Sequence, residues 1–261
     1  MLGEKYTKLF PKNVSFDWFM ARAGDVYREM DGRTTLRFRE KGRSYFIKKH
    51  LGIGWREVFK NLTQLKLPVL SAKNEFVAIN QLTGLGIDTM AIVAYGLRGR
   101  NPAKIQSFVV TEDLIDTISL EDYCASWGEG EAPSFREKQL LINKVAHITK
   151  IMHLSGMNHR DLYICHFLLR GMPSVSTDFK LFLIDLHRAQ IRKKVPERWL
   201  VKDLAALYFS AMHIGLTKRD LLRYIKQYKG ESVRDLLERD GLFWKKVEAK
   251  AYALNNRNTD Q

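Results

Sequence analysis

The feature that most constrains this chain is a pair of aspartates, each next to a short apolar run. Asp161 belongs to the segment Met157-Asn-His-Arg-Asp-Leu-Tyr-Ile-Cys-His-Phe-Leu-Leu169, which follows a long helical pattern. Asp185 comes 24 residues later and closes the apolar run Leu181-Phe-Leu-Ile184. A carboxylate at the end of a buried strand needs a partner, because an isolated buried charge is costly. A magnesium ion is such a partner.

The first part of the chain is dominated by strand patterns and the remainder by helical ones. Short strands are expected at 26–30, 34–39 and 44–48, with Asp31-Gly32 and Lys41-Gly42 as turns between them. Helical spacing at 55–66 and 72–83, the second with Ser71 as N-cap, precedes strand-length runs at 91–95 and 107–111. After Thr111, helices are expected at about 118–126, 135–154, 199–213, 217–229, 231–239 and 242–253, with short apolar runs at 167–169 and 180–184.

This order of patterns predicts an α+β protein with two lobes. The pattern changes near 111–117, which divides a small β-rich N-lobe, 1–113, from a larger helical C-lobe, 114–261. A sheet lobe joined to a helical lobe, with a cleft between them, is a natural ligand site.

Phosphoryl transfer needs few parts: a carboxylate that orients the hydroxyl, a carboxylate that holds the metal, and a cation on the phosphates. His159-Arg160-Asp161 resembles the catalytic loop H-R-D-x-x-x-x-N of protein kinases, which makes Asp161 the candidate base. The alternative is a surface turn in which Asp161 caps a helix. Asp185 stands where kinases have D-F-G, although the sequence reads Asp185-Leu186-His187. These motifs indicate a bilobal protein-kinase-like fold.

His166 occupies the position at which the kinase loop has its second metal ligand, an Asn. Magnesium prefers oxygen ligands. Either His166 contacts phosphate or another part of the ligand, or Asp185 carries most of the metal binding. A zinc site is disfavoured, because the spacings of its candidate ligands match no closed structural site; these are His159, Cys165, His166 and His187.

Lys48 ends Tyr45-Phe-Ile-Lys48, which has the shape of the kinase strand that carries the phosphate-binding lysine. Glu75, near the start of the helix at 72–83, would hold Lys48 as an ion pair. Lys49 is a competing candidate on the opposite face of the strand. The alternative is that Lys48 and Lys49 are both surface lysines without a role in binding.

Two further ATP contacts are expected in the N-lobe. The chain has no G-x-G-x-x-G between its first two strands, so backbone amides and Arg33 would cover the phosphates. The connector around Glu112 would meet the adenine with its backbone.

Asp203 lies in Lys202-Asp-Leu-Ala-Ala-Leu-Tyr208, after a basic segment. In a kinase-like fold it would hold the backbone of the catalytic loop. The alternative is a carboxylate favoured by the positive end of a helix dipole.

The formal net charge of +14 indicates a polyanionic partner without choosing among nucleic acid, membrane and phosphorylated substrate. The two cysteines form no disulfide framework, which favours a reducing, cytoplasmic compartment. Neither a signal peptide nor a transmembrane helix is expected. A basic cluster follows the second aspartate and consists of Arg188, Arg192, Lys193, Lys194, Arg198 and Lys202.

Together, NHRDLYICHFLL, IDLHRAQ, KDLAALYFS and IGLTKRD resemble the lipopolysaccharide core heptose(I) kinases, the WaaP/RfaP family. RTTLRF, KNLTQLKLPVL and SFVVTEDL are similar as well, so the resemblance covers roughly 20–250. It implies that His166 is a family trait. It also implies transfer of the γ-phosphate of ATP, with Mg²⁺, to O4 of the first inner-core heptose of lipopolysaccharide. The expected location is the cytoplasmic face of the inner membrane, in peripheral contact with its anionic surface.

The basic cluster suits that acceptor, and we expect Arg188, Arg192, Lys193, Lys194 and Arg198 to help hold it. Acyl carrier protein is a further partner that the resemblance implies, whereas nucleic acid is not expected as a partner. Two alternatives stay open from the sequence. One is a kinase for another inner-core sugar, such as 3-deoxy-octulosonate, or for a protein, and the other is a pseudokinase that binds lipopolysaccharide without chemistry.

Overall fold

The computed structural model describes residues 2–12, 14–30, 32–52, 54, 55, 63, 71–101, 103–128, 133–173 and 177–259. The chain divides into two compact units. Unit 1 contains Met1–Gln81, Met90–Ile115 and Leu186–Arg188, and unit 2 contains Leu82–Thr89, Asp116–Asp185 and Ala189–Gln261. Within the part of the chain described, no helix has both the length and the apolar character needed to cross a membrane.

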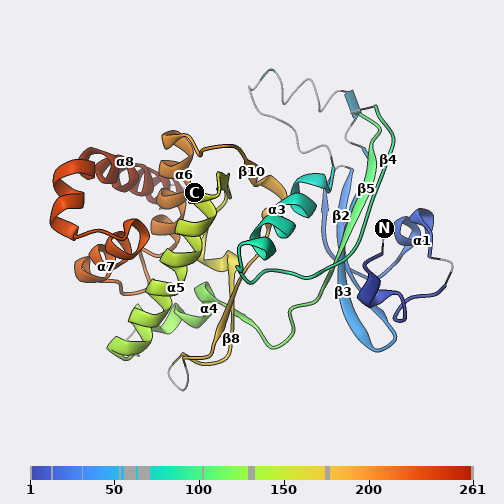
Figure 1. Ribbon diagram of the computed structural model, residues 1–261, viewed down its shortest axis with the longest axis horizontal. Helices are drawn as coiled ribbons and strands as arrows, with labels where there is room; N and C mark the ends of the chain where they lie inside the picture. The colour runs from blue at the N-terminus through green and yellow to red at the C-terminus, as the bar shows by residue number, and fades with distance from the viewer. Residues whose placement is uncertain are drawn as a thin grey trace. The chain divides into compact units, whose positions relative to one another are not determined.

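Unit 1 is built on one antiparallel sheet with the strand order β1-β2-β3-β5-β4 (Figure 1). Its strands are β1 (Asp25–Met30), β2 (Arg33–Glu40), β3 (Arg43–His50), β4 (Ile92–Arg98) and β5 (Gln106–Glu112). The three predicted N-terminal strands are therefore confirmed, as are the strand-length runs at 91–95 and 107–111. The unit also holds η1 (Glu4–Tyr6), α1 (Phe16–Ala21), most of α3 (Lys73–Gly84) and η4 (Leu186–Arg188).

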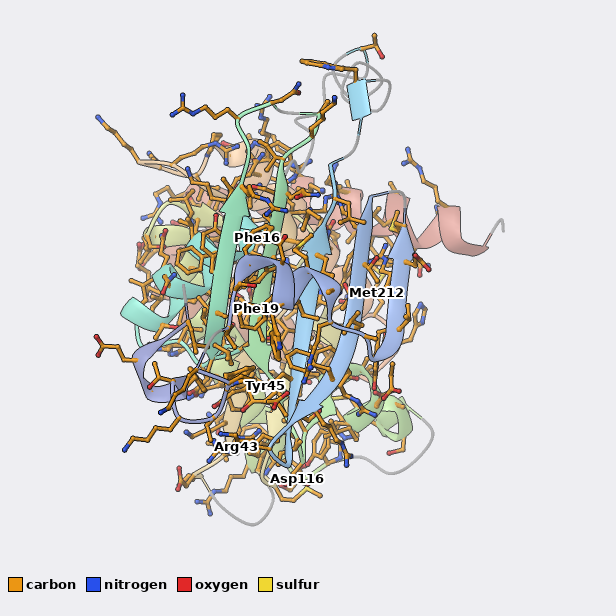
Figure 2. The ribbon with its side chains drawn as sticks, turned by 90° about the vertical axis from the view of Figure 1, so that its right-hand side faces the viewer. Phe16, Phe19, Arg43, Tyr45, Asp116 and Met212 are labelled. Carbon is orange, nitrogen blue, oxygen red and sulfur yellow. The ribbon has the colours of Figure 1, made fainter. Side chains whose placement is uncertain are left out.

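Aromatic side chains from the N-terminal segment cover one face of this sheet. Figure 2 shows α1 lying across that face, with Phe16, Phe19 and Tyr45 labelled. Phe19 packs against Phe108 of β5, with ring centroids 4.7 Å apart, and Phe10 packs against Tyr45 at 5.3 Å. Because side chains alternate along a strand, this apolar core fixes which residues of β3 point toward α1.

Unit 2 is mainly helical (Figure 1). Its helices are α4 (Leu120–Tyr123), η2 (Ala125–Gly128), α5 (Phe135–Leu154), η3 (Ile164–His166), α6 (Glu197–Ser210), α7 (Lys218–Lys229) and α8 (Val233–Thr259). Two small sheets, ordered β6-β8-β9 and β10-β7, consist of β6 (Ile118–Ser119), β8 (Phe167–Arg170) and β9 (Lys180–Leu183), and of β10 (Gln190–Ile191) and β7 (Met157–Asn158).

The predicted C-terminal helices at 135–154, 199–213 and 217–229 are confirmed within a few residues at their ends. The predicted helix at 55–66 lies almost wholly outside the described residues. The two helices expected at 231–239 and 242–253 are wrong as separate elements, because α8 runs through both. A glycine inside a helix costs only about 1 kcal/mol, and buried Val247 and Ala251 anchor α8 in a core with α6 and α7. Gly241 therefore interrupts the helical pattern of the sequence but does not interrupt the helix.

Candidate active site

Lys48 and Lys49 lie on opposite faces of β3 and have different partners. Lys48 Nζ is 2.7 Å from Oε1 of Glu75, which is 1% exposed at the start of α3. Lys49 Nζ donates to the backbone carbonyls of Met20, at 2.8 Å, and Arg22, at the end of α1. Burial lowers the pKa of Lys49. The ion pair predicted between Lys48 and Glu75 is present, whereas Lys49 is tied to the backbone on the face covered by α1.

Arg33 begins β2 and pairs with His50 across the β2–β3 ladder. His50 is buried, and this burial, helped by the positive charges of Arg33 and Lys48, lowers the pKa of His50 to about 3. The imidazole is therefore neutral at physiological pH. His50 adds no positive charge beside Arg33 and Lys48 at this end of the sheet.

Glu112, predicted to lie in the adenine connector, is the last residue of β5 and pairs with Tyr45 of β3. Its backbone N–H donates to the Ala91 carbonyl at 2.9 Å, and its carboxylate is 4.0 Å from Lys5 Nζ. This N–H already donates a hydrogen bond within unit 1, so it cannot also donate to the adenine ring. Any adenine contact of Glu112 therefore has to use another backbone group.

The loop His159–Asp161 follows β7 and is held by the carboxylate of Asp203. Asp203, fully buried in α6, accepts hydrogen bonds from the His159 N–H at 2.6 Å and from the Arg160 N–H at 2.8 Å. Arg160 has a φ of +77°, a left-handed conformation that costs a non-glycine residue energy. The predicted role of Asp203 in holding this loop is confirmed.

Asp203 is itself fixed by a buried hydrogen-bonded chain. His153 Nε2 lies 3.4 Å from Asp203 Oδ2, and His153 Nδ1 lies 2.8 Å from the Tyr228 hydroxyl. A carboxylate only accepts, so His153 donates through Nε2 and receives the Tyr228 O–H on Nδ1. Helices α5, α6 and α7 thus each contribute one side chain to the support of the loop. Sequence reasoning missed both residues because neither belongs to a motif. His153 lies only a few residues before the loop, at the end of α5, whereas Tyr228 lies far from it in sequence.

His159 connects the two aspartate segments. Its Nε2 is 2.9 Å from the carbonyl oxygen of Ile184, the residue before Asp185. Burial lowers the pKa of His159, so the ring is neutral and donates through Nε2. Asp185 has a φ of +60°, so its backbone too is in the left-handed region. Strain at both Arg160 and Asp185, in a network that fixes them, is typical of functional loops.

His166 lies between the two aspartates. Its Nδ1 is 2.7 Å from the Asp161 carbonyl, and its Nε2 is 3.6 Å from Asp185 Oδ2. A carbonyl only accepts, so Nδ1 carries the proton of that bond, and in the neutral ring the lone pair is on Nε2. That lone pair and the Asp185 carboxylate are both electron donors and lie side by side.

The described residues contain no group of three or more His, Cys, Asp or Glu side chains that could hold a metal ion. Magnesium in phosphoryl-transfer sites is bound by one or two carboxylates, with water and substrate phosphates completing the shell. Asp185, whose side chain is 25% exposed, offers one such carboxylate. A single carboxylate therefore fits a magnesium ion that is bound together with a nucleotide. It does not fit a metal site in which the protein supplies every ligand.

The basic segment after Asp185 is divided by the structure. Arg188 belongs to η4 of unit 1, while Arg192, Lys193, Lys194 and Arg198 belong to unit 2. Arg192 N–H donates to the Gly156 carbonyl at 2.9 Å and its guanidinium donates to Asn158 Oδ1 at 2.7 Å, which joins the segment to β7. Lys193 and Lys194 are exposed.

Three side chains in or near this segment were absent from the predicted acceptor site, namely Arg160, Trp199 and Lys202, although Lys202 was counted in the basic cluster. The guanidinium of Arg160 lies 5.1 Å from the centroid of the Trp199 ring, and Lys202 Nζ lies 4.0 Å from Asp161 Oδ1. The signal available in the sequence was an aromatic residue among cations, Arg198-Trp-Leu-Val-Lys202, in which Trp199 and Lys202 have the i, i+3 spacing of one helix face.

Known proteins resemble this chain over nearly its whole length. Relatives named lipopolysaccharide core heptose(I) kinase WaaP are 46% identical in Escherichia coli and 48% identical in Pseudomonas aeruginosa. Each alignment covers 98% of this chain, and 97% and 96% of the respective relatives. A solved structure, described as WaaP in complex with acyl carrier protein, is 43% identical, with a TM-score of 0.83 over 97% of this chain and 98% of the other.

This structural likeness and the β-rich and helix-rich units confirm the predicted α+β, protein-kinase-like fold. The model of the lipopolysaccharide kinase (Kdo/WaaP) family matches residues 17–228, a range that includes Lys48, Glu75, Asp161, Asp185 and Asp203. The match spans most of the chain, and the relatives are aligned over almost their full lengths. The chain therefore belongs to the lipopolysaccharide kinase (Kdo/WaaP) family.

Proposed function

We propose that this kinase transfers the γ-phosphate of ATP to O4 of the first heptose of the lipopolysaccharide inner core. Its membership in a kinase family implies that it uses ATP. The heptose acceptor is supported by the names of relatives that share 46 to 48% identity with this chain. The observation that carries the catalytic assignment is the loop of Asp161, which the buried Asp203 carboxylate fixes through two hydrogen bonds.

Each group has a role that its surroundings support. Asp161 orients the acceptor hydroxyl and takes its proton, and the neighbouring backbone is held so that this carboxylate keeps its position. Lys48, oriented by Glu75, binds the phosphates of ATP. Arg33 adds charge beside Lys48, and the backbone around Glu112 contacts the adenine. In this proposal, residues 1–113 form the nucleotide-binding lobe and 114–261 the catalytic and acceptor-binding lobe.

Asp185 is the residue proposed to hold Mg²⁺, with His166 next to it. When bound, the ion would neutralise charge on the phosphates and hold them for transfer. His166 Nε2 lies 3.6 Å from Asp185 Oδ2, so the imidazole is close enough to complete the same site. Its proton on Nδ1 is donated to the Asp161 carbonyl, which couples the position of the metal residue to that of the base.

The acceptor and its surroundings complete the proposal. Arg188, Arg192, Lys193, Lys194 and Arg198 are proposed to contact the acidic groups of the lipopolysaccharide core. Acyl carrier protein is a proposed partner, because the solved structure of the relative is a complex with that protein. The enzyme would act at the cytoplasmic face of the inner membrane, in peripheral contact with an anionic surface, as the net charge of +14 favours.

The test is transfer of labelled phosphate from ATP, with Mg²⁺, to lipopolysaccharide from a strain that lacks core phosphate. Label at O4 of the heptose is expected with the wild-type protein. Asp161→Asn and Asp185→Asn are expected to lower transfer by about a thousandfold or more while the far-UV circular dichroism is retained. Turnover like that of the wild type in either variant would remove these residues from the mechanism.

A second acceptor is favoured by one observation, since the matching family model covers both Kdo and WaaP kinases. The candidate is 3-deoxy-octulosonate, the acidic sugar of the inner core. Competition between acceptors that contain only this sugar and acceptors that also contain heptose separates the two assignments. Label on the acidic sugar, with heptose unlabelled, would replace the heptose assignment.

A further inference from the structure

Four cationic side chains approach the ring of one tryptophan in unit 2. Trp199 lies in the first turns of α6. The charged groups of Arg160, Arg192, Arg198 and Lys202 lie 5.1, 5.9, 5.4 and 5.7 Å from its ring centroid. These five residues are called the Trp199 cluster below. They come from the catalytic loop, from the segment after β10 and from α6, so the fold brings them together.

A cluster of this kind favours an anion. Each cation is attracted to the electron-rich indole face, but like charges gathered at one ring repel one another. Three acidic residues adjoin cluster members in sequence. Glu197 contacts Lys246, with Nζ and Oε1 2.7 Å apart, and Asp203 accepts from the backbone of the catalytic loop. Asp161 lies 4.0 Å from Lys202 Nζ, so four cations share one nearby carboxylate among these three. Arginine forks match the oxygens of carboxylate and phosphate groups, and a ring platform beneath them limits their motion. Arg192 is further fixed by its bond to Asn158.

The cluster lies beside the proposed base. Lys202 Nζ is 4.0 Å from Asp161 Oδ1, and Arg160 directly precedes Asp161 in the loop held by Asp203. An anion bound by Lys202 and its neighbours would therefore lie close to the hydroxyl that Asp161 orients. Lys193 and Lys194 of the same segment are exposed and are not counted in the cluster.

We propose that the Trp199 cluster binds a carboxylate or phosphate group that the acceptor carries within a few ångströms of the phosphorylated hydroxyl. The inference rests on the proposed function and narrows it. The acceptor must present an anionic group next to its reacting sugar, and Arg160, Lys202 and Trp199 join Arg192 and Arg198 in recognising it. The site discriminates between acceptors and adds no step to the phosphoryl transfer.

Steady-state kinetics of Arg198→Gln and Lys202→Gln test the site. Arg198 is exposed, so its loss should not disturb folding. We expect the acceptor KM to rise about ten- to a hundredfold for each variant, with the ATP KM within about twofold of the wild type. Arg198→Lys should recover part of the loss. Arg234→Gln is the matched control, because its side chain is 87% exposed on α8, and its acceptor KM should not change.

Chemically altered acceptors identify the anionic group. Wild-type enzyme is given the native acceptor, one whose carboxylates have been reduced to alcohols, and one whose phosphates have been removed. One of the altered acceptors should show the raised KM, and Arg198→Gln should no longer distinguish it from the native acceptor. Equal KM values for all three acceptors, or an ATP KM that rises in place of the acceptor KM, would overturn the proposal.

A binding measurement separates this inference from the proposed function. Acceptor binding should change the tryptophan fluorescence of the wild type, and this change should be lost in Trp199→Phe. Failure of the proposed function appears as wild-type protein that transfers no phosphate to heptose. Failure of the inference appears as normal transfer together with an unchanged acceptor KM and an unchanged fluorescence response in Arg198→Gln, Lys202→Gln and Trp199→Phe.

Discussion

Lys48 and Lys49 are consecutive in β3, yet the Lys48 ammonium contacts a carboxylate and the Lys49 ammonium contacts two backbone carbonyls. The Lys48 contact is 2.7 Å from Glu75 Oε1, and the Lys49 contacts are with Met20 and Arg22. The alternation of a β-strand makes this difference possible, because adjacent side chains point to opposite faces. Lys48 is therefore the lysine proposed to bind a ligand, while Lys49 ties α1 to the sheet.

Removing each lysine should consequently affect different properties. Lys48→Met alone would leave the buried Glu75 carboxylate unpaired, so the test is the double variant Lys48→Met/Glu75→Gln. We expect this variant to lose transfer activity while its free energy of unfolding changes by about 1 kcal/mol. Lys49→Met should lower the free energy of unfolding by about 2 to 3 kcal/mol, with the ATP KM of the folded enzyme unchanged. Urea unfolding and initial rates provide both measurements, and the opposite pattern would reverse the assignment.

Asp203 should act on the position of the catalytic loop without contacting either substrate. Asp203→Asn replaces one accepting oxygen by an NH2 group, so the side chain can accept from only one of the two N–H groups, that of His159 or that of Arg160. We expect kcat to fall about ten- to a hundredfold and the ATP KM to stay nearly constant, because Lys48 and Glu75 are untouched. The free energy of unfolding should fall by about 1 to 3 kcal/mol. A normal kcat in a destabilised variant would make Asp203 purely structural.

Local sequence patterns were enough for the parts of the site that lie within a few residues of one another. The loop at Asp161 and the strand that carries Lys48 could be placed because each has its own flanking pattern. The choice between Lys48 and Lys49 could not be made in this way. Alternation separates their faces, but only the packing of Phe19 and Phe108 establishes which face α1 covers.

Contacts between distant segments were less accessible. The Trp199 cluster unites the loop at Arg160 with Lys202, 42 residues later, and no periodicity specifies that approach. The break expected in α8 was wrong for a related reason. Asp240-Gly241 is a strong local turn signal, yet the burial of Val247 and Ala251 outweighs the small cost of one helical glycine.

Gly156 should be indispensable to the connection between β7 and the basic segment. Its φ is +82°, and a Cβ added to it would lie 1.8 Å from the carbonyl oxygen of Arg192. Gly42, with a φ of +77° and nothing within 4 Å of such a Cβ, is a matched control for backbone strain alone. We expect Gly42→Ala to lower the free energy of unfolding by about 1 kcal/mol, and Gly156→Ala to lower it by about 3 kcal/mol or more. Equal effects in urea unfolding would show that strain, and not the close approach, dominates.

His50 provides a pH-dependent contribution to stability whose sign can be worked out. Burial, with the charges of Arg33 and Lys48, lowers the pKa of His50 to about 3 from its ordinary value of 6.5. Below pH 6.5 the unfolded chain therefore binds a proton that the folded protein does not accept, so stability is lost as the pH falls toward 3. Between pH 7 and 4.5, the free energy of unfolding of the wild type should fall by about 2 to 3 kcal/mol more than that of His50→Gln. Parallel pH profiles for the two proteins would mean that His50 is protonated in the folded state.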